Sequence, residues 1–142
     1  MKVPFLDLKR SYDALAGELE GALLRSARTG WYILGDEVAS FESAFASYCE
    51  ADYAVGLSNG LDALKLALLA VGVGEGDEVI TAANTFITTV SSIALVGAKP
   101  ILIDAGNDDN LDIDQIERHI TSKTKAIMPV HWTGRACDMS RL

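Results

Sequence analysis

Residues 58–68 read SNGLDALKLAL, a turn sequence that runs directly into an almost wholly apolar segment. Asn59 and Gly60 tolerate backbone angles that other residues resist, so the pair predicts a turn. The apolar segment after it predicts a buried helix over residues 61–70. Because YAVGLS (residues 53–58) has the composition of a strand, the stretch predicts a strand, a tight turn and a helix in that order.

The segments that follow continue this alternation. Short apolar runs predict further strands at residues 77–81 (DEVIT), 100–104 (PILID) and 125–132 (KAIMPVHW). Helical patterns separate them, at residues 84–96 and from Asp114 onward, where Asp114 and Glu117 stand at capping-box spacing. Strands that alternate with helices indicate a mainly parallel sheet with helical crossovers, so the predicted fold class is α/β.

The beginning of the chain has a different pattern, which predicts two amphipathic helices. Residues 11–28 have helical apolar spacing, and Thr29 with Gly30 supplies a stop. Asp36 is positioned to cap a second helix, whose apolar stripe consists of Val38, Phe41, Phe45 and Tyr48. The sequence therefore predicts an N-terminal helical segment over residues 1–52 and an α/β domain over residues 53–142.

Composition excludes several classes of protein. The 142 residues carry a net charge of −8, whereas nucleic-acid binders build their surfaces from clustered Lys and Arg. Cys49 and Cys137 are far apart and form no C-x-x-C pair, so we expect neither a disulfide framework nor a zinc site, and a reduced cytoplasmic compartment fits. The N-terminus lacks the apolar region of a signal peptide, and no run approaches the roughly 18 apolar residues of a membrane span.

The SNG turn is the first candidate binding site. In open parallel sheets ligands lie beyond the carboxyl ends of the strands, and this turn follows such an end. The start of the next helix offers unpaired N–H groups and a partial positive charge, which can hold a phosphate without a basic side chain. The alternative, a tight turn that only packs a core helix, is equally compatible with this stretch.

Other motifs give weaker signals. GVGEG (residues 72–76) precedes a strand, whereas a dinucleotide-binding fingerprint must follow one, so it predicts a helix stop and a turn. DDNLDID (residues 108–114) resembles a calcium loop, but Ile113 stands where Gly is needed, so we predict a solvated loop and no metal site. His119 is expected at a surface or boundary. His131 ends a strand at the same edge as the SNG turn, but without a positioned carboxylate we do not assign it as a general base.

Two long blocks of the sequence carry a family resemblance. Residues 30–104, which open GWYILGDEV and close PILID, and residues 120–139 (ITSKTKAIMPVHWTGRACDM) together resemble the front of the DegT/DnrJ/EryC1/StrS family of sugar aminotransferases. The resemblance implies a pyridoxal-phosphate enzyme of fold type I, usually a homodimer, which transfers an amino group from glutamate to a keto-deoxysugar carried on a nucleotide. Residues 53–142 would then be an incomplete cofactor-binding part of the large domain.

The resemblance also implies roles for single residues. Asn59, Gly60 and Leu61 match positions at which the backbone holds the cofactor phosphate, and many members carry Thr where this chain has Leu61. Phe86, in ANTF, matches the aromatic residue that stacks on the pyridine ring. From the pattern alone, a core aromatic stays open as the less favoured alternative for Phe86.

The catalytic groups of the family lie further along the chain. The Schiff-base Lys and the Asp paired with the pyridine nitrogen follow the PVHWTG segment, so no catalytic residue is expected among these 142 residues. We therefore expect an N-terminal fragment that is inactive by itself. Two alternatives stay open: a related sugar dehydratase, in which His replaces the Lys, and a truncated non-catalytic binding module.

Overall fold

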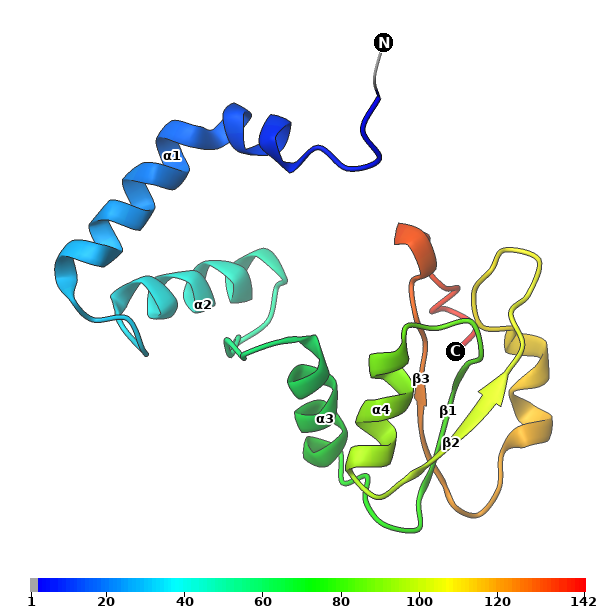
Figure 1. The fold of residues 1–142 in the computed structure, drawn as a ribbon. Helices are drawn as coiled ribbons and strands as arrows, with labels where there is room; N and C mark the ends of the chain where they lie inside the picture. The colour runs from blue at the N-terminus through cyan, green and yellow to red at the C-terminus, as the bar shows by residue number, and fades with distance from the viewer. Residues whose placement is uncertain (1–2) are drawn as a thin grey trace. The chain divides into compact units, whose positions relative to one another are not determined.

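The computed structural model describes residues 3–142 and divides the chain into two compact units that meet in sequence between Gly56 and Leu57. The first unit is helical, and the second contains a three-stranded sheet with helices (Figure 1). Each unit is described by itself. Among residues 3–142 no helix is both long enough and apolar enough to cross a membrane.

The first unit consists of α1 (Leu8–Thr29) and α2 (Asp36–Tyr48). The Asp7 carboxylate caps α1 by accepting a hydrogen bond from the Arg10 N–H at 3.0 Å, and Gly30 ends the helix in a left-handed conformation with φ 66°. The predicted stop at Gly30 is thus confirmed. The predicted cap at Asp36 is wrong by one residue, because Gly35 is the N-cap and Asp36 begins the helix.

The strand predicted over residues 53–58 is wrong. This segment forms no ladder with the sheet, whose described order is β2-β1-β3. A strand needs a neighbouring strand to pair its backbone groups, and here the Gly56 N–H donates to the Glu42 carboxylate at 2.7 Å instead. Apolar composition therefore identified an extended segment, whereas the pairing of that segment with a strand depends on residues that are distant in sequence.

The sheet of the second unit is parallel, as predicted. It consists of β1 (Glu78–Ala82), β2 (Lys99–Ile103) and β3 (Thr124–Met128), with β1 in the centre. Ile80 of β1 lies opposite Ile101 of β2 and Ile127 of β3. The predicted GVGEG turn connects the helix α3 (Gly60–Ala70) to β1, and α4 (Ile87–Leu95) connects β1 to β2.

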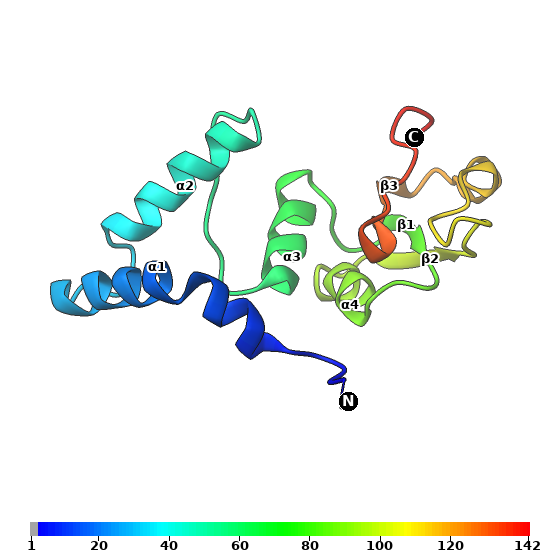
Figure 2. The ribbon, with the colours of Figure 1, turned by 90° about the horizontal axis from the view of Figure 1, so that it is seen from above.

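The core lies on both faces of β1, whose five residues are all buried. On one face α4 packs against β1 and β2, and α3 packs against α4; the buried cluster here consists of Leu68, Val73, Val79, Ile93 and Ala98. On the other face the residues after β2 cover a second cluster of Ile80, Ala82, Ile103, Leu111 and Ile116. Figure 2 shows these three layers, with the sheet seen between the two helices and the later short turns. Alternate residues of β1 thus point to opposite layers.

Two helices differ from the predictions. The helix expected over residues 84–96 begins only at Ile87, because Asn84 donates its side-chain amide to the Asp109 carbonyl at 2.8 Å and Phe86 is the N-cap. The helix expected from Asp114 is instead two 3₁₀ turns, η1 (Ile113–Gln115) and η2 (Glu117–His119).

These turns contribute to the core. Ile116 belongs to the second core cluster and Ile113, three residues before it, packs against that cluster. The capping box predicted from Asp114 and Glu117 is wrong, because Asp112 caps the turn by accepting from the Asp114 N–H at 3.1 Å.

Candidate functional site at the carboxyl edge of the sheet

The residues predicted to bind the cofactor lie at one edge of the second unit. The three parallel strands end at this edge, and both α3 and α4 begin there (Figure 1). Asn59 and Gly60 lie at the start of α3, and Phe86 is the N-cap of α4. Because α3 and α4 pack against each other, the structure brings these residues to the same edge of one compact unit.

The start of α3 is fixed by side-chain hydrogen bonds. The Asn59 carbonyl oxygen Oδ1 accepts from the Asp62 N–H at 3.0 Å, and the Asn59 amide donates to the Asp62 carboxylate at 3.0 Å. The Ser58 hydroxyl also donates to this carboxylate. These bonds restrain the turn, so the N–H groups that follow are held in fixed directions.

The Gly60 and Leu61 N–H groups remain for a ligand. As the first residues of the helix they have no acceptor within it, and the next N–H, that of Asp62, is taken by Asn59. Gly60 is exposed, and a Cβ added there would meet no atom within 4 Å. The turn therefore combines free donors, a helix N-terminus and open space, which fits a phosphate group.

Phe86 is 66% exposed. Its ring is not part of either apolar cluster of the described residues. An exposed flat ring at the carboxyl edge is available to stack on another flat ring.

Asn110 joins two loops at this edge, a role that no sequence pattern indicated. Its carbonyl oxygen Oδ1 accepts from the Trp132 N–H at 3.1 Å, and its amide donates to the Ala136 carbonyl at 3.3 Å and to the Asp108 carboxylate at 3.1 Å. Asn110 and Leu111 are 2% and 3% exposed. The prediction of a solvated loop over residues 108–114 is therefore wrong at its centre.

Asn110 stabilises the charged form of the Asp108 carboxylate. The hydrogen bond from the Asn110 side chain holds the pKa of Asp108 below its ordinary value. A second backbone-directed bond, from the Asn110 N–H at 3.2 Å, acts in the same direction. The loop is thus ordered by its own polar groups.

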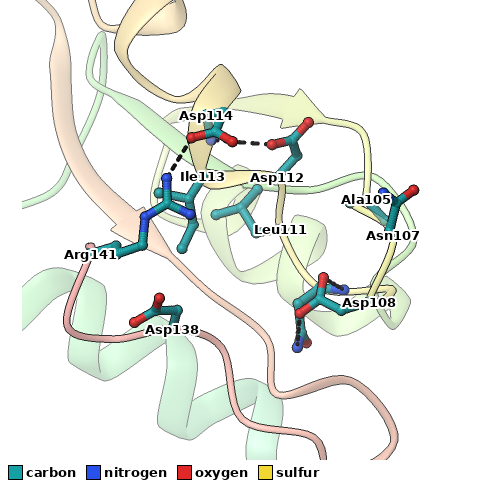
Figure 3. A pocket seen from close by; sticks show the side chains of 11 residues that line it. Ala105, Asn107, Asp108, Leu111, Asp112, Ile113, Asp114, Asp138 and Arg141 are labelled. Atoms are coloured by element: carbon teal, nitrogen blue, oxygen red, sulfur yellow. Dashed lines mark hydrogen bonds and ion pairs between the residues drawn. The ribbon is translucent and has the colours of Figure 1, made fainter.

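A hollow of about 470 Å³ lies beside this loop (Figure 3). Asp112, Asp114 and Asp138 contribute carboxylates to it, and Arg141 donates to the Asp114 carboxylate. Within the part of the chain that the structure describes, no group of His, Cys, Asp and Glu is arranged to hold a metal ion. Because carboxylates repel phosphate, this hollow does not compete with the start of α3 as a phosphate site.

The two histidines both lie near the carboxyl ends of elements but have different environments. His119 is half-buried, and its Nδ1 lies 2.8 Å from the Gln115 carbonyl oxygen. His131 is exposed, and its Nδ1 accepts a hydrogen bond from the Cys137 N–H at 3.1 Å. The expectation for His119, a boundary position, is confirmed.

Comparison with known sequences identifies close relatives of this chain. A dTDP-3-amino-3,6-dideoxy-alpha-D-galactopyranose transaminase of Aneurinibacillus thermoaerophilus is 48% identical over 99% of this chain and 39% of its own length. A dTDP-3-amino-3,4,6-trideoxy-alpha-D-glucose transaminase of Streptomyces venezuelae is 44% identical over 99% of this chain and 38% of its own length. The chain thus spans about two-fifths of the length of these relatives.

Comparison with solved structures finds the same kind of relatives as comparison with sequences. DesV of S. venezuelae, in complex with a ketimine intermediate, matches with a TM-score of 0.95 and 43% identity over 99% of this chain and 38% of that one. NtdA of Bacillus subtilis, with bound cofactor PMP, matches with a TM-score of 0.93 and 35% identity over 99% of this chain and 33% of that one. The predicted fold, part of a fold-type I aminotransferase, is confirmed. The model of the DegT/DnrJ/EryC1/StrS aminotransferase family matches residues 14–142, and the chain belongs to this family.

Proposed function

We propose that the whole protein is a pyridoxal-phosphate-dependent aminotransferase that transfers an amino group from glutamate to a keto-deoxysugar carried on a nucleotide. The observation that carries the proposal is the start of α3 at the carboxyl edge, where the Gly60 and Leu61 N–H groups have no acceptor within the helix and Gly60 is exposed with open space beside its Cα. The names of the relatives support it, because several are transaminases of dTDP-linked amino sugars. One solved relative is named with bound PMP and another with a ketimine intermediate.

Each predicted site residue has a binding role in the proposal. The Gly60 and Leu61 N–H groups hold the phosphate. Asn59 orients these N–H groups, because its hydrogen bonds to Asp62 restrain the turn. The exposed face of Phe86 orients the pyridine ring by offset stacking. Pyridoxal phosphate, when bound, supplies an electron sink for cleavage of bonds at the amino-bearing carbon.

The proposal extends to the rest of the protein through the family. The proton-transferring Lys lies outside residues 1–142, so we propose that this chain alone binds cofactor without transferring amino groups. We also propose a homodimer in the cytoplasm. Relatives that are transaminases do not favour the dehydratase alternative.

The experiment measures 2-oxoglutarate produced by the full-length protein from glutamate. The keto-sugar acceptors carry dTDP, UDP or GDP, the three nucleotides found in the names of relatives. We expect 2-oxoglutarate with one nucleotide series and none when the sugar is omitted. The proposal is refuted if the protein binds cofactor but produces no 2-oxoglutarate with any acceptor. Parallel reactions with aspartate or glutamine as the amino donor show whether glutamate is preferred.

A further inference from the structure

The hydrogen bond from Cys137 assigns the tautomer of His131. The Cys137 N–H can only donate a hydrogen bond, so the Nδ1 that receives it at 3.1 Å carries a lone pair. The ring is then neutral, with its proton on Nε2. In His119, by contrast, Nδ1 carries a proton, because the Gln115 carbonyl oxygen 2.8 Å away can only accept.

The partner of His131 is firmly held. Cys137 is 5% exposed, and its Sγ donates to the Val130 carbonyl at 3.1 Å. Asn110 fixes both ends of the turn between them, accepting from the Trp132 N–H and donating to the Ala136 carbonyl. The buried Asn110 side chain can satisfy this N–H and this carbonyl only in one amide orientation. The Cys137 N–H therefore keeps a fixed position relative to the His131 ring.

His131 also lies on the side of the sheet edge where the ligand is proposed. β3 pairs with β1 in parallel, with Met128 opposite Thr81. Phe86 follows β1 and His131 follows β3, so both exposed rings come after neighbouring strands at the same edge. A fixed donor at this place is useful to a ligand that presents oxygen atoms.

We propose that His131 contacts the bound ligand through its Nε2–H, donating a hydrogen bond to an oxygen of the cofactor or of the sugar substrate, and that Asn110 and Cys137 position it. This inference rests on the proposed function. A neutral donor suits a site whose phosphate is already held by backbone groups, because it directs one oxygen without adding a charge. The contact of His131 would be a third ligand contact, from the loop after β3, in addition to those from the start of α3 and from Phe86.

The test uses two substitutions of His131 in the full-length protein. His131→Gln retains an amide donor near the position of Nε2, whereas His131→Asn places its amide near Nδ1 and offers no donor at the outer position. We expect His131→Asn to weaken ligand binding about tenfold, and His131→Gln to stay within about threefold of the unsubstituted protein. His119→Asn is the matched control and should leave binding unchanged.

Three readouts separate the possible results. The dissociation constant of pyridoxal phosphate without sugar reports a contact to the cofactor, and the KM of the sugar reports a contact to the substrate. Nitrogen-15 NMR reports the tautomer, with an unprotonated Nδ1 expected for His131 and a protonated Nδ1 for His119. A protonated Nδ1 at His131 overturns the inference.

Equal binding of both ligands by the Asn and Gln variants, with unchanged melting temperatures, overturns it as well. In that case the proposed function stands, because the unsubstituted protein still binds and turns over. If the unsubstituted protein binds no pyridoxal phosphate, the proposed function fails and the inference fails with it.

Discussion

Replacing Gly60 by Val separates cofactor binding from stability at the start of α3. A Cβ at this position meets no atom within 4 Å, so the substitution introduces no Cβ clash among the described residues. Gly60 is the first residue of the helix, where substitutions away from packed groups change the unfolding free energy by roughly 0.5 kcal/mol or less. Lower flexibility of the unfolded chain would even stabilise the variant slightly.

Binding should respond much more strongly. The Val side chain occupies the space through which a phosphate approaches the Gly60 and Leu61 N–H groups. Losing one charge-assisted hydrogen bond costs about 1.5–3 kcal/mol, and moving the anion from the helix end costs about 0.3–1 kcal/mol more. The sum of roughly 2–4 kcal/mol corresponds to an increase of about 30- to 1,000-fold in the dissociation constant of pyridoxal phosphate.

Titration of the full-length protein with pyridoxal phosphate, followed by absorbance, measures this constant, and thermal unfolding without cofactor measures stability. Gly17→Val is the matched control, because Gly17 also has nothing within 4 Å of an added Cβ but lies in α1. We expect the control to bind as the unsubstituted protein does. A Gly60→Val protein that binds the cofactor within threefold of the parent would refute the placement of the phosphate.

Three further predictions concern other parts of the second unit. Phe86→Leu should loosen the cofactor while Phe86→Tyr largely retains it, because the flat face carries the stacking contact; equal dissociation constants for the two variants would contradict this role. The lowered pKa of Asp108 means that its contribution to stability is present above the ordinary aspartate pKa and lost as pH falls through the lowered one. Asp108→Asn should therefore weaken the dependence of the unfolding free energy on pH between about pH 5 and 2. Urea unfolding at several pH values measures this dependence, and the same dependence in the variant and the parent would show that the carboxylate is not coupled to folding. Borohydride treatment of the 142-residue chain with pyridoxal phosphate should label no single Lys stoichiometrically. Mass analysis of the peptides checks this, and one full adduct would contradict the assignment of the Schiff-base Lys to another part of the protein. The lysines to examine are Lys65, Lys99, Lys123 and Lys125.

Local patterns predicted what local physics decides. The apolar helix after Asn59, the stop at Gly30 and the buried central strand all follow from residues close in sequence, and the structure confirms them. The parallel arrangement follows from the alternation of elements. The expected position of Gly60 at the carboxyl edge agrees with the structure, although the strand that it was expected to follow is not formed. Phe86 was assigned from the family resemblance.

The failures involve partners that are distant in sequence. Residues 53–58 have the composition of a strand, but whether they pair depends on a neighbouring strand. Asn110 reads as a loop residue, and only its contacts with Trp132 and Ala136 explain its burial. For His131 the sequence indicated the correct edge but could not give the tautomer, which depends on the Cys137 N–H.

The two edges of the sheet differ in how they contribute to the protein. At the amino edge the nearly buried Glu78 accepts from the Thr121 hydroxyl at 2.6 Å and lies 3.7 Å from the Lys99 ammonium, so removing a partner there leaves a buried charge and destabilises the fold. At the carboxyl edge, Gly60 and Phe86 are exposed and lie outside both apolar clusters. Substitutions at this edge can therefore remove ligand contacts without opening the core. Substitutions at the amino edge should lower the unfolding free energy, whereas those at Gly60 or Phe86 should lower cofactor affinity with little change in stability. A loss of binding in the Gly60 or Phe86 variants can then be assigned to the site rather than to misfolding.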